Sequence, residues 1–76
     1  MLELYGTASC PYTAQVREDL QWRRREFVEY DVESDAAALQ RMLRLANGDR
    51  MVPVLIEDGS VIQTGVEGRG CYAGGG

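Results

Sequence analysis

Two kinds of apolar pattern alternate along the first part of the chain. A short apolar stretch at residues 1–5 predicts a strand that enters a small polar loop. Pro11 suits the first position of a helix, because its missing N–H has no intrahelical partner there, and we predict a helix over residues 11–24. The apolar positions of this helix are Ala14, Val16, Leu20 and Trp22.

A second strand and a second helix are predicted next. Residues 27–32 are rich in aromatic and branched side chains, which favours a strand. Ser34 is a good N-cap with Asp35 in the first turn, and residues 36–46 have the periodicity of a helix. Its apolar face consists of Leu39, Met42, Leu43 and Ala46. The pair Asn47-Gly48 provides a typical helix end.

The last clear pattern is a hairpin. Residues 52–57 predict a strand with Pro53 near its start, where a missing N–H is tolerated. The pair Asp58-Gly59 predicts a two-residue turn, and residues 60–63 predict the antiparallel partner strand. Beyond the hairpin the pattern dissolves into glycine-rich sequence, and we expect a mobile tail from about residue 73.

The order β-α-β-α-β-β predicts a single α/β domain over residues 1–76. Its first two strands should be parallel through a right-handed crossover. The net charge is −4 and every basic residue is an arginine, which argues against nucleic acid and against anionic membranes as partners. The basic run at residues 23–25 is flanked by acids and is interpreted as helix-end capping. Since neither a leader pattern nor a membrane-length apolar run is visible, we expect a cytoplasmic protein.

The chain has two cysteines and no histidine, too few ligands for a structural zinc site, so no metal is expected. Cys10 precedes Pro11 and is therefore predicted to be the N-cap of the first helix. There its sulfur would face unpaired backbone N–H groups and the positive end of the helix dipole. We expect this to lower the pKa of the Cys10 thiol and to make it a redox-active nucleophile. The alternative is a small buried apolar residue.

Several segments resemble glutaredoxins. Cys10-Pro11-Tyr12-Thr13 resembles their C-P-Y-C site with the second cysteine replaced by threonine. Residues 29–32 resemble their second strand, and Val52-Pro53 resembles their T-V-P segment with Met51 in place of threonine. Asp58-Gly59 matches the turn between their last two strands. The chain looks closest to short bacterial glutaredoxin-like proteins, some of which carry selenocysteine at the position of Cys10.

The resemblance implies a thioredoxin-like fold with a short or missing C-terminal helix. It also implies a monomeric, glutathione-linked thiol–disulfide oxidoreductase that serves cell redox homeostasis and electron transport. Glutathione would be the co-substrate, and protein disulfides are the other partners to expect. In the monothiol mechanism Cys10 attacks a glutathione mixed disulfide and a second glutathione releases it. In a variant of this mechanism Cys71 resolves the intermediate instead; the alternative for Cys71 is an unpartnered thiol.

The resemblance also assigns substrate-binding residues. Pro11 and Tyr12 would border the glutathione groove, although Tyr12 could simply pack against the loop. Pro53 would be a cis proline facing Cys10, which leaves the backbone of Val52 to pair with an extended substrate. The hydroxyl of Thr13 would donate a hydrogen bond to the thiolate, or Thr13 is only a first-turn surface residue.

Two departures from the family weaken the expected grip on glutathione. Thr7 stands where the family has a lysine, and residues 65–68 have no clean match to its glycine-glycine-x-aspartate segment. Arg50 could supply a charge instead. Two other functions stay open: a carrier that holds a [2Fe–2S] cluster between two subunits, and a ubiquitin-like carrier suggested by the diglycine end, although that fold opens with a hairpin.

Overall fold

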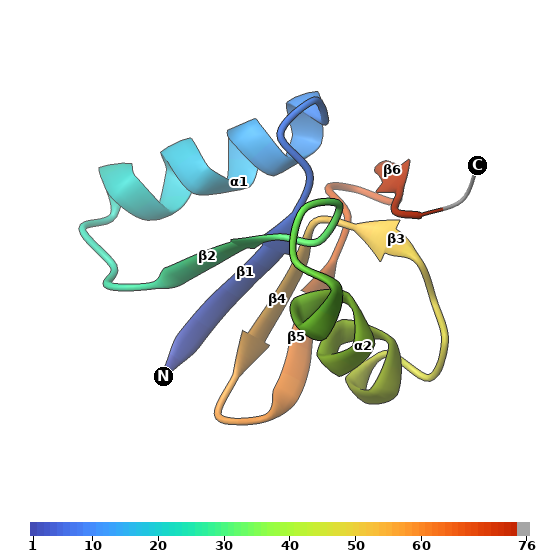
Figure 1. Ribbon diagram of the computed structural model, residues 1–76. Helices are drawn as coiled ribbons and strands as arrows, with labels where there is room; N and C mark the ends of the chain where they lie inside the picture. Colours follow the sequence, from blue (N-terminus) through green and yellow to red (C-terminus); the bar gives the residue numbers. More distant parts are fainter. Residues whose placement is uncertain (75–76) are drawn as a thin grey trace.

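The computed structural model describes residues 1–74 and consists of six strands and two helices in that range (Figure 1). In chain order they are β1 (Leu2–Gly6), α1 (Pro11–Trp22), β2 (Val28–Asp31), α2 (Ala36–Leu45), β3 (Met51–Val52), β4 (Val54–Glu57), β5 (Ser60–Thr64) and β6 (Cys71–Tyr72). Neither helix within these residues is long and apolar enough to cross a membrane.

Four strands form the central sheet in the order β2-β1-β4-β5. β1 and β2 are parallel through the crossover helix α1, as predicted, and β4 is antiparallel to both β1 and β5. The predicted two-residue turn is confirmed at Asp58 and Gly59, which have φ values of 51° and 83°. Two positive φ values are what a type I′ hairpin turn requires.

The two helices cover opposite faces of this sheet (Figure 1). Side chains alternate along β1, so Leu4 packs with Val16 and Leu20 of α1, while Tyr5 packs with Met42 of α2. The cluster on the α2 side also contains Cys10, Val52 and Ala73. Cys10, the predicted nucleophile, and Val52, a predicted substrate-binding residue, therefore both belong to this apolar cluster.

Three sequence predictions about α1 and α2 are wrong in detail. Trp22 does not join the apolar face of α1: it is 86% exposed, because it lies two positions from Leu20 and points the other way. The helix ends at Trp22 instead of residue 24, since Arg24 adopts φ 56° and reverses the chain. Asp35 is the N-cap of α2 in place of Ser34, and its carboxylate accepts a hydrogen bond from the Ala38 N–H at 3.0 Å.

The predicted strand at residues 52–57 is two strands. The Val52–Pro53 peptide bond is cis, and the chain turns there from β3 into β4. β3 leaves the central sheet and forms a separate two-stranded antiparallel ladder with β6. The proline thus divides one apolar run into a strand of the sheet and a strand near the first turn of α1.

The segment beyond Thr64 is more ordered than its sequence suggested. Val66 and Arg69 form an isolated antiparallel bridge, and β6 follows at residues 71–72. No helix occurs between residues 65 and 74, which agrees with the expected short or missing C-terminal helix. Ala73, where the mobile tail was expected to begin, is fully buried. Gly75 and Gly76, the rest of that tail, lie outside the described residues.

Candidate functional site

Cys10 is the last residue of the loop that connects β1 to α1. Its backbone has φ −85° and ψ 117°, and it is the N-cap of α1, with Pro11 in the first helical position. Its N–H donates to the carbonyl of Thr7 at 3.3 Å, and its carbonyl accepts from the N–H of Ala14 at 3.2 Å. The side chain is 2% exposed. This is the helix-start position at which a thiolate is stabilised by backbone N–H groups.

Cys10 is joined to Cys71 by a disulfide bond. The two Cα atoms are 6.0 Å apart although the residues are separated by 61 positions in the sequence. That distance is ordinary for a disulfide. The bond brings the start of α1 and the end of the chain together. The structure therefore unites the two cysteines, whose relationship the sequence left open.

Thr13 lies one turn after Cys10 but faces inward. It is fully buried, so the alternative of a first-turn surface residue is wrong. Its hydroxyl oxygen accepts a hydrogen bond from the N–H of Thr7 at 3.4 Å. In the described residues no hydrogen bond joins this hydroxyl to the Cys10 sulfur. Gly6 packs directly against the Thr13 side chain, and a Cβ on Gly6 would lie 2.9 Å from the Thr13 Cβ. Thr13 thus braces the loop that carries Cys10.

The backbone of Val52 is already paired. Val52 is opposite Cys71, and Met51 is opposite Tyr72, in the antiparallel β3–β6 ladder. Val52 and Pro53 are both buried, and Val52 belongs to the same apolar cluster as Cys10. The edge that was expected to receive an extended substrate therefore holds the chain's own β6 (Figure 1).

Arg50 and Tyr12 flank this arrangement. The Arg50 guanidinium donates to the carbonyl of Ala73 at 3.3 Å, and the Arg50 carbonyl accepts from the Ala73 N–H at 2.8 Å. Tyr12 is half-buried against the apolar cluster, whereas Pro11 is exposed. Arg50 was singled out in the sequence for a charge toward glutathione, and here it fastens the chain just after β6.

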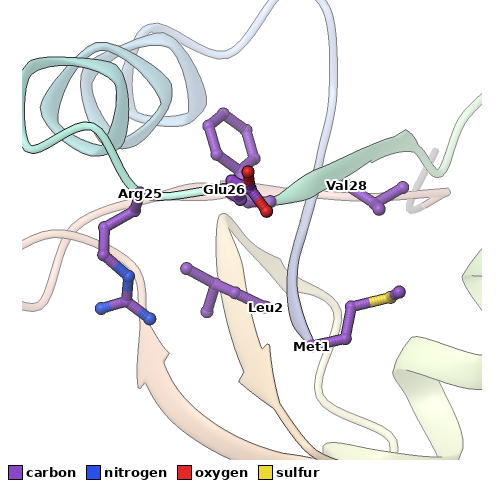
Figure 2. A pocket seen from close by; sticks show the side chains of 6 residues that line it. Met1, Leu2, Arg25, Glu26 and Val28 are labelled. Carbon is purple, nitrogen blue, oxygen red and sulfur yellow. The ribbon is translucent and has the colours of Figure 1, made fainter.

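The site consists of a strand edge next to a cysteine. A hollow of about 610 Å³, open to solvent, lies elsewhere, at the end of the sheet around Met1, Leu2, Arg25 and Val28 (Figure 2). A smaller one of about 180 Å³ lies between α1 and the β4–β5 hairpin. Neither is lined by Cys10, Cys71 or Val52.

Sequence reasoning missed β6 and the contacts that seat it. Gly70 is the clearest of these, because a Cβ at this position would lie 2.9 Å from Met51 Cγ and even closer to the carbonyl oxygen of Val52. A two-residue strand among glycines has no periodicity to detect, and its paired residues lie 19 and 21 positions away in the chain. The only available signal was the second cysteine itself.

Comparisons with known proteins identify sequence relatives of this chain. The sequence model of the glutaredoxin family matches residues 2–62. A probable glutaredoxin of Synechocystis, slr1562, is 35% identical over 52 residues, which cover 68% of this chain and about half (48%) of that relative. An uncharacterised glutaredoxin-like 8.6 kDa protein from the rubredoxin operon of Clostridium pasteurianum is 31% identical over 62 residues, covering 82% of this chain and 81% of the relative.

Solved structures give the same result for the fold. The thioredoxin-like protein BC3987 is 32% identical to this chain, with a TM-score of 0.73 over 82% of this chain and 84% of that protein. Its T8A mutant gives the same TM-score and identity over 82% of each chain. The predicted thioredoxin-like fold is thus confirmed.

Proposed function

Because the chain belongs to the glutaredoxin family, and so has a thiol-based redox function, we propose that it is a thiol–disulfide oxidoreductase in which Cys10 attacks and Cys71 resolves. The disulfide between these two residues is the observation that carries the proposal. A cysteine at the N-cap of a helix has the environment of an attacking thiolate. A second cysteine already within bonding distance can complete the exchange without an external thiol.

With a glutathione disulfide as substrate, the exchange runs in two steps. The Cys10 thiolate attacks one sulfur, a Cys10–glutathione disulfide forms, and the other glutathione leaves as a thiolate that takes up a proton. The Cys71 thiolate then attacks the Cys10 sulfur and releases the second glutathione. The protein dithiol is oxidised to the disulfide, and the substrate disulfide is reduced to two thiols. The reverse sequence reduces the protein.

Glutathione is the proposed co-substrate, and the cytoplasm, where it is abundant, is the proposed location. Two features support it: the backbone edge at Val52, which suits an extended peptide-like thiol, and the positive charge of Arg50 beside that edge. In the competing monothiol route, a second glutathione releases the first and Cys71 takes no part. The Cys10–Cys71 bond favours the intramolecular route.

Intact mass after brief exposure of the reduced protein to oxidised glutathione tests the proposal. We expect the native protein to lose two hydrogens and retain no adduct. Cys71→Ser should retain one glutathione, and Cys10→Ser should react far more slowly, because Cys71 lacks the helix-start environment. A stable adduct on native Cys10 would establish the monothiol route. No reaction at either cysteine would overturn the assignment to glutathione.

The iron–sulfur alternative stays a prediction, and it has its own test. Protein purified without oxygen in the presence of glutathione should be brown, with charge-transfer absorption, if two subunits hold a cluster. The ubiquitin-like alternative disagrees with the observed order, since the chain opens with β1, α1 and β2 and has a thioredoxin-like fold.

A further inference from the structure

We propose that β6 is an internal stand-in for the substrate, so that each resolving step is also an exchange of strands on β3. When Cys71 attacks the mixed disulfide, β6 docks on β3 and displaces the backbone of the substrate. When the Cys10–Cys71 bond is reduced, β6 leaves and the edge opens. This inference rests on the proposed function and describes how the same site is controlled.

β6 is placed as a bound substrate would be. A mixed disulfide between Cys10 and a cysteine peptide is the same chemical bond as the one between Cys10 and Cys71. In the structure, the residue that supplies the second sulfur also pairs antiparallel with Val52. An extended peptide linked to Cys10 would need the same edge, because backbone pairing with a strand edge is how extended chains are held.

The contacts that β6 makes with β3 and Arg50 are specific. Gly70 lies so close to the Val52 carbonyl oxygen and to Met51 that any side chain at position 70 would collide with β3. Arg50 holds Ala73 by both its carbonyl and its guanidinium. Ala73 itself is fully buried in the cluster that contains Cys10. These contacts therefore add to the disulfide in holding β6 on β3, and we expect them to be too few to hold it there once the disulfide is reduced.

β6 and a bound substrate peptide exclude each other. In the part of the chain that the structure describes, β3 has one ladder partner, and Cys10 forms one disulfide. A substrate peptide and β6 cannot both pair with Val52 and both bond to Cys10. Oxidised protein is thus closed to substrate. Opening it requires two external thiols: the first forms a mixed disulfide with one cysteine, the second releases it, and the pair leaves as an external disulfide.

The contacts of Gly70 also predict which peptides fit the opened edge. Gly70 directly precedes Cys71, and a Cβ there would collide with β3. The group that directly precedes the substrate cysteine must therefore also lack a side chain at the corresponding carbon. Glycine meets this condition, and so does the γ-linked glutamyl group of glutathione, whose carbonyl is attached to a CH₂. We infer that the substrate class is an extended cysteine peptide with such an unbranched group immediately before the cysteine.

The test is a pair of alanine substitutions in one loop. Gly70→Ala places a Cβ against Val52 and Met51, whereas at Gly68 a Cβ meets nothing within 4 Å, so Gly68→Ala is the control for loop strain at φ 79°. In a fixed glutathione redox buffer, the ratio of glutathione adduct to Cys10–Cys71 disulfide should rise about tenfold or more in Gly70→Ala, because overpacking of this kind opposes docking. Gly68→Ala carries backbone strain at a positive φ but no collision with β3, so it should raise the ratio clearly less than Gly70→Ala does. An unchanged ratio in Gly70→Ala overturns the inference.

Two further measurements separate this inference from the proposed function. The rate at which reduced Cys10 is alkylated should be alike in all three proteins, and a uniformly unreactive Cys10 would overturn the proposed function itself. Amide exchange at Ala73 N–H, which donates to Arg50, should be slow in the oxidised protein and fast after reduction. The Val32 N–H, bonded to Gly6 at 2.9 Å, should stay slow in both forms. Equal protection of Ala73 in both redox states would contradict strand exchange and leave the oxidoreductase assignment standing.

The specificity can be measured with two short peptides. Mixed disulfides of Cys10 with Gly-Cys-Gly and with Val-Cys-Gly should form with equilibrium constants that differ by about tenfold in favour of the glycine peptide, because valine would clash with the β3 backbone. Cys71→Ser is the protein to use, since it stops at the mixed disulfide. Equal constants would contradict the proposed substrate class.

Discussion

Arg50 and Ala73 are bonded to each other in both directions. The Ala73 N–H donates to the Arg50 carbonyl at 2.8 Å, and the Arg50 guanidinium donates to the Ala73 carbonyl at 3.3 Å. A substitution of the Arg50 side chain removes the guanidinium hydrogen bond and leaves the backbone hydrogen bond in place. We predict that Arg50→Gln lowers the equilibrium constant for closing the Cys10–Cys71 disulfide by about two- to tenfold, the effect of one typical hydrogen bond. Arg69→Gln, which removes the charge of another exposed arginine just before β6, is the control. An effect of equal size there would show that net charge, and not the bond to Ala73, is responsible.

Thr13 supports the Cys10 loop through its buried hydroxyl. Thr13→Val keeps the shape but leaves the Thr7 N–H without its acceptor, so we predict a loss of about 1–3 kcal/mol in unfolding free energy, measured by urea denaturation. Thr13→Ser keeps the acceptor and should lose less. The pH dependence of Cys10 alkylation should be the same in both variants. A raised alkylation midpoint in Thr13→Val alone would restore the alternative in which this hydroxyl donates to the thiolate.

Arg24 adopts the left-handed backbone conformation that glycine usually provides after a helix. The Arg25 N–H bonds to the Leu20 carbonyl and the Arg24 N–H to the Gln21 carbonyl, each at 3.0 Å, which is the Schellman arrangement. Arg24→Gly should therefore stabilise the protein by about 0.5–1 kcal/mol, because it removes the Cβ strain. Arg23→Gly, at φ −79°, should destabilise it. Thermal unfolding of the two variants decides the matter, and stabilisation by both would contradict the explanation from φ.

Tyr5 should make the fold sensitive to alkali. Burial raises the pKa of Tyr5, against an opposing hydrogen bond from Arg41. A group whose pKa is higher in the folded protein contributes stability that is present below the unfolded pKa of about 10 and declines as pH rises toward the folded value. The free energy of unfolding, measured in urea, should thus fall above about pH 10, by up to about 1.4 kcal/mol per pH unit for this one proton.

The control for this alkaline effect is a second tyrosine. Tyr5→Phe should be less stable at pH 8, because it loses bonds to Arg41 and Glu3, but its stability should fall less steeply above pH 10. Tyr72→Phe, which alters a largely exposed ring, should follow the native curve. Identical slopes in all three proteins would show that Tyr5 does not titrate as a buried group.

The sequence was most informative where local chemistry decides the structure. Asp58-Gly59 predicted its turn because positive φ favours these residues, and Pro11 placed Cys10 at a helix N-cap for a similarly local reason. The errors have equally physical causes. Ser34 and Asp35 are both good caps, and only the folded chain shows which one meets Ala38. Residue 53 was predicted inside one strand, but its cis bond divides that strand.

The candidate site was predictable by residue but not by arrangement. Cys10, Val52 and Cys71 could each be named from motif or composition. Their relationship depends on β6, a strand of two residues whose pairing joins Val52 to Cys71 across 19 positions of chain. Such contacts leave no periodic trace, because their stability comes from the partner and not from the segment itself.

Because the two cysteines are far apart in the sequence, the redox reaction also changes the stability of the fold. The Cys10–Cys71 bond encloses 61 positions of a 76-residue chain in one covalent loop. In the chain-entropy account, closing a loop of that length lowers the entropy of the unfolded chain and so raises its free energy by about 4 kcal/mol. Each cycle of oxidation and reduction would therefore alternate between a covalently cross-linked chain and one without the cross-link. By linkage, a substitution that stabilises the folded oxidised form more than the folded reduced form should raise both the thermal stability of the oxidised protein and the equilibrium constant for closing the disulfide.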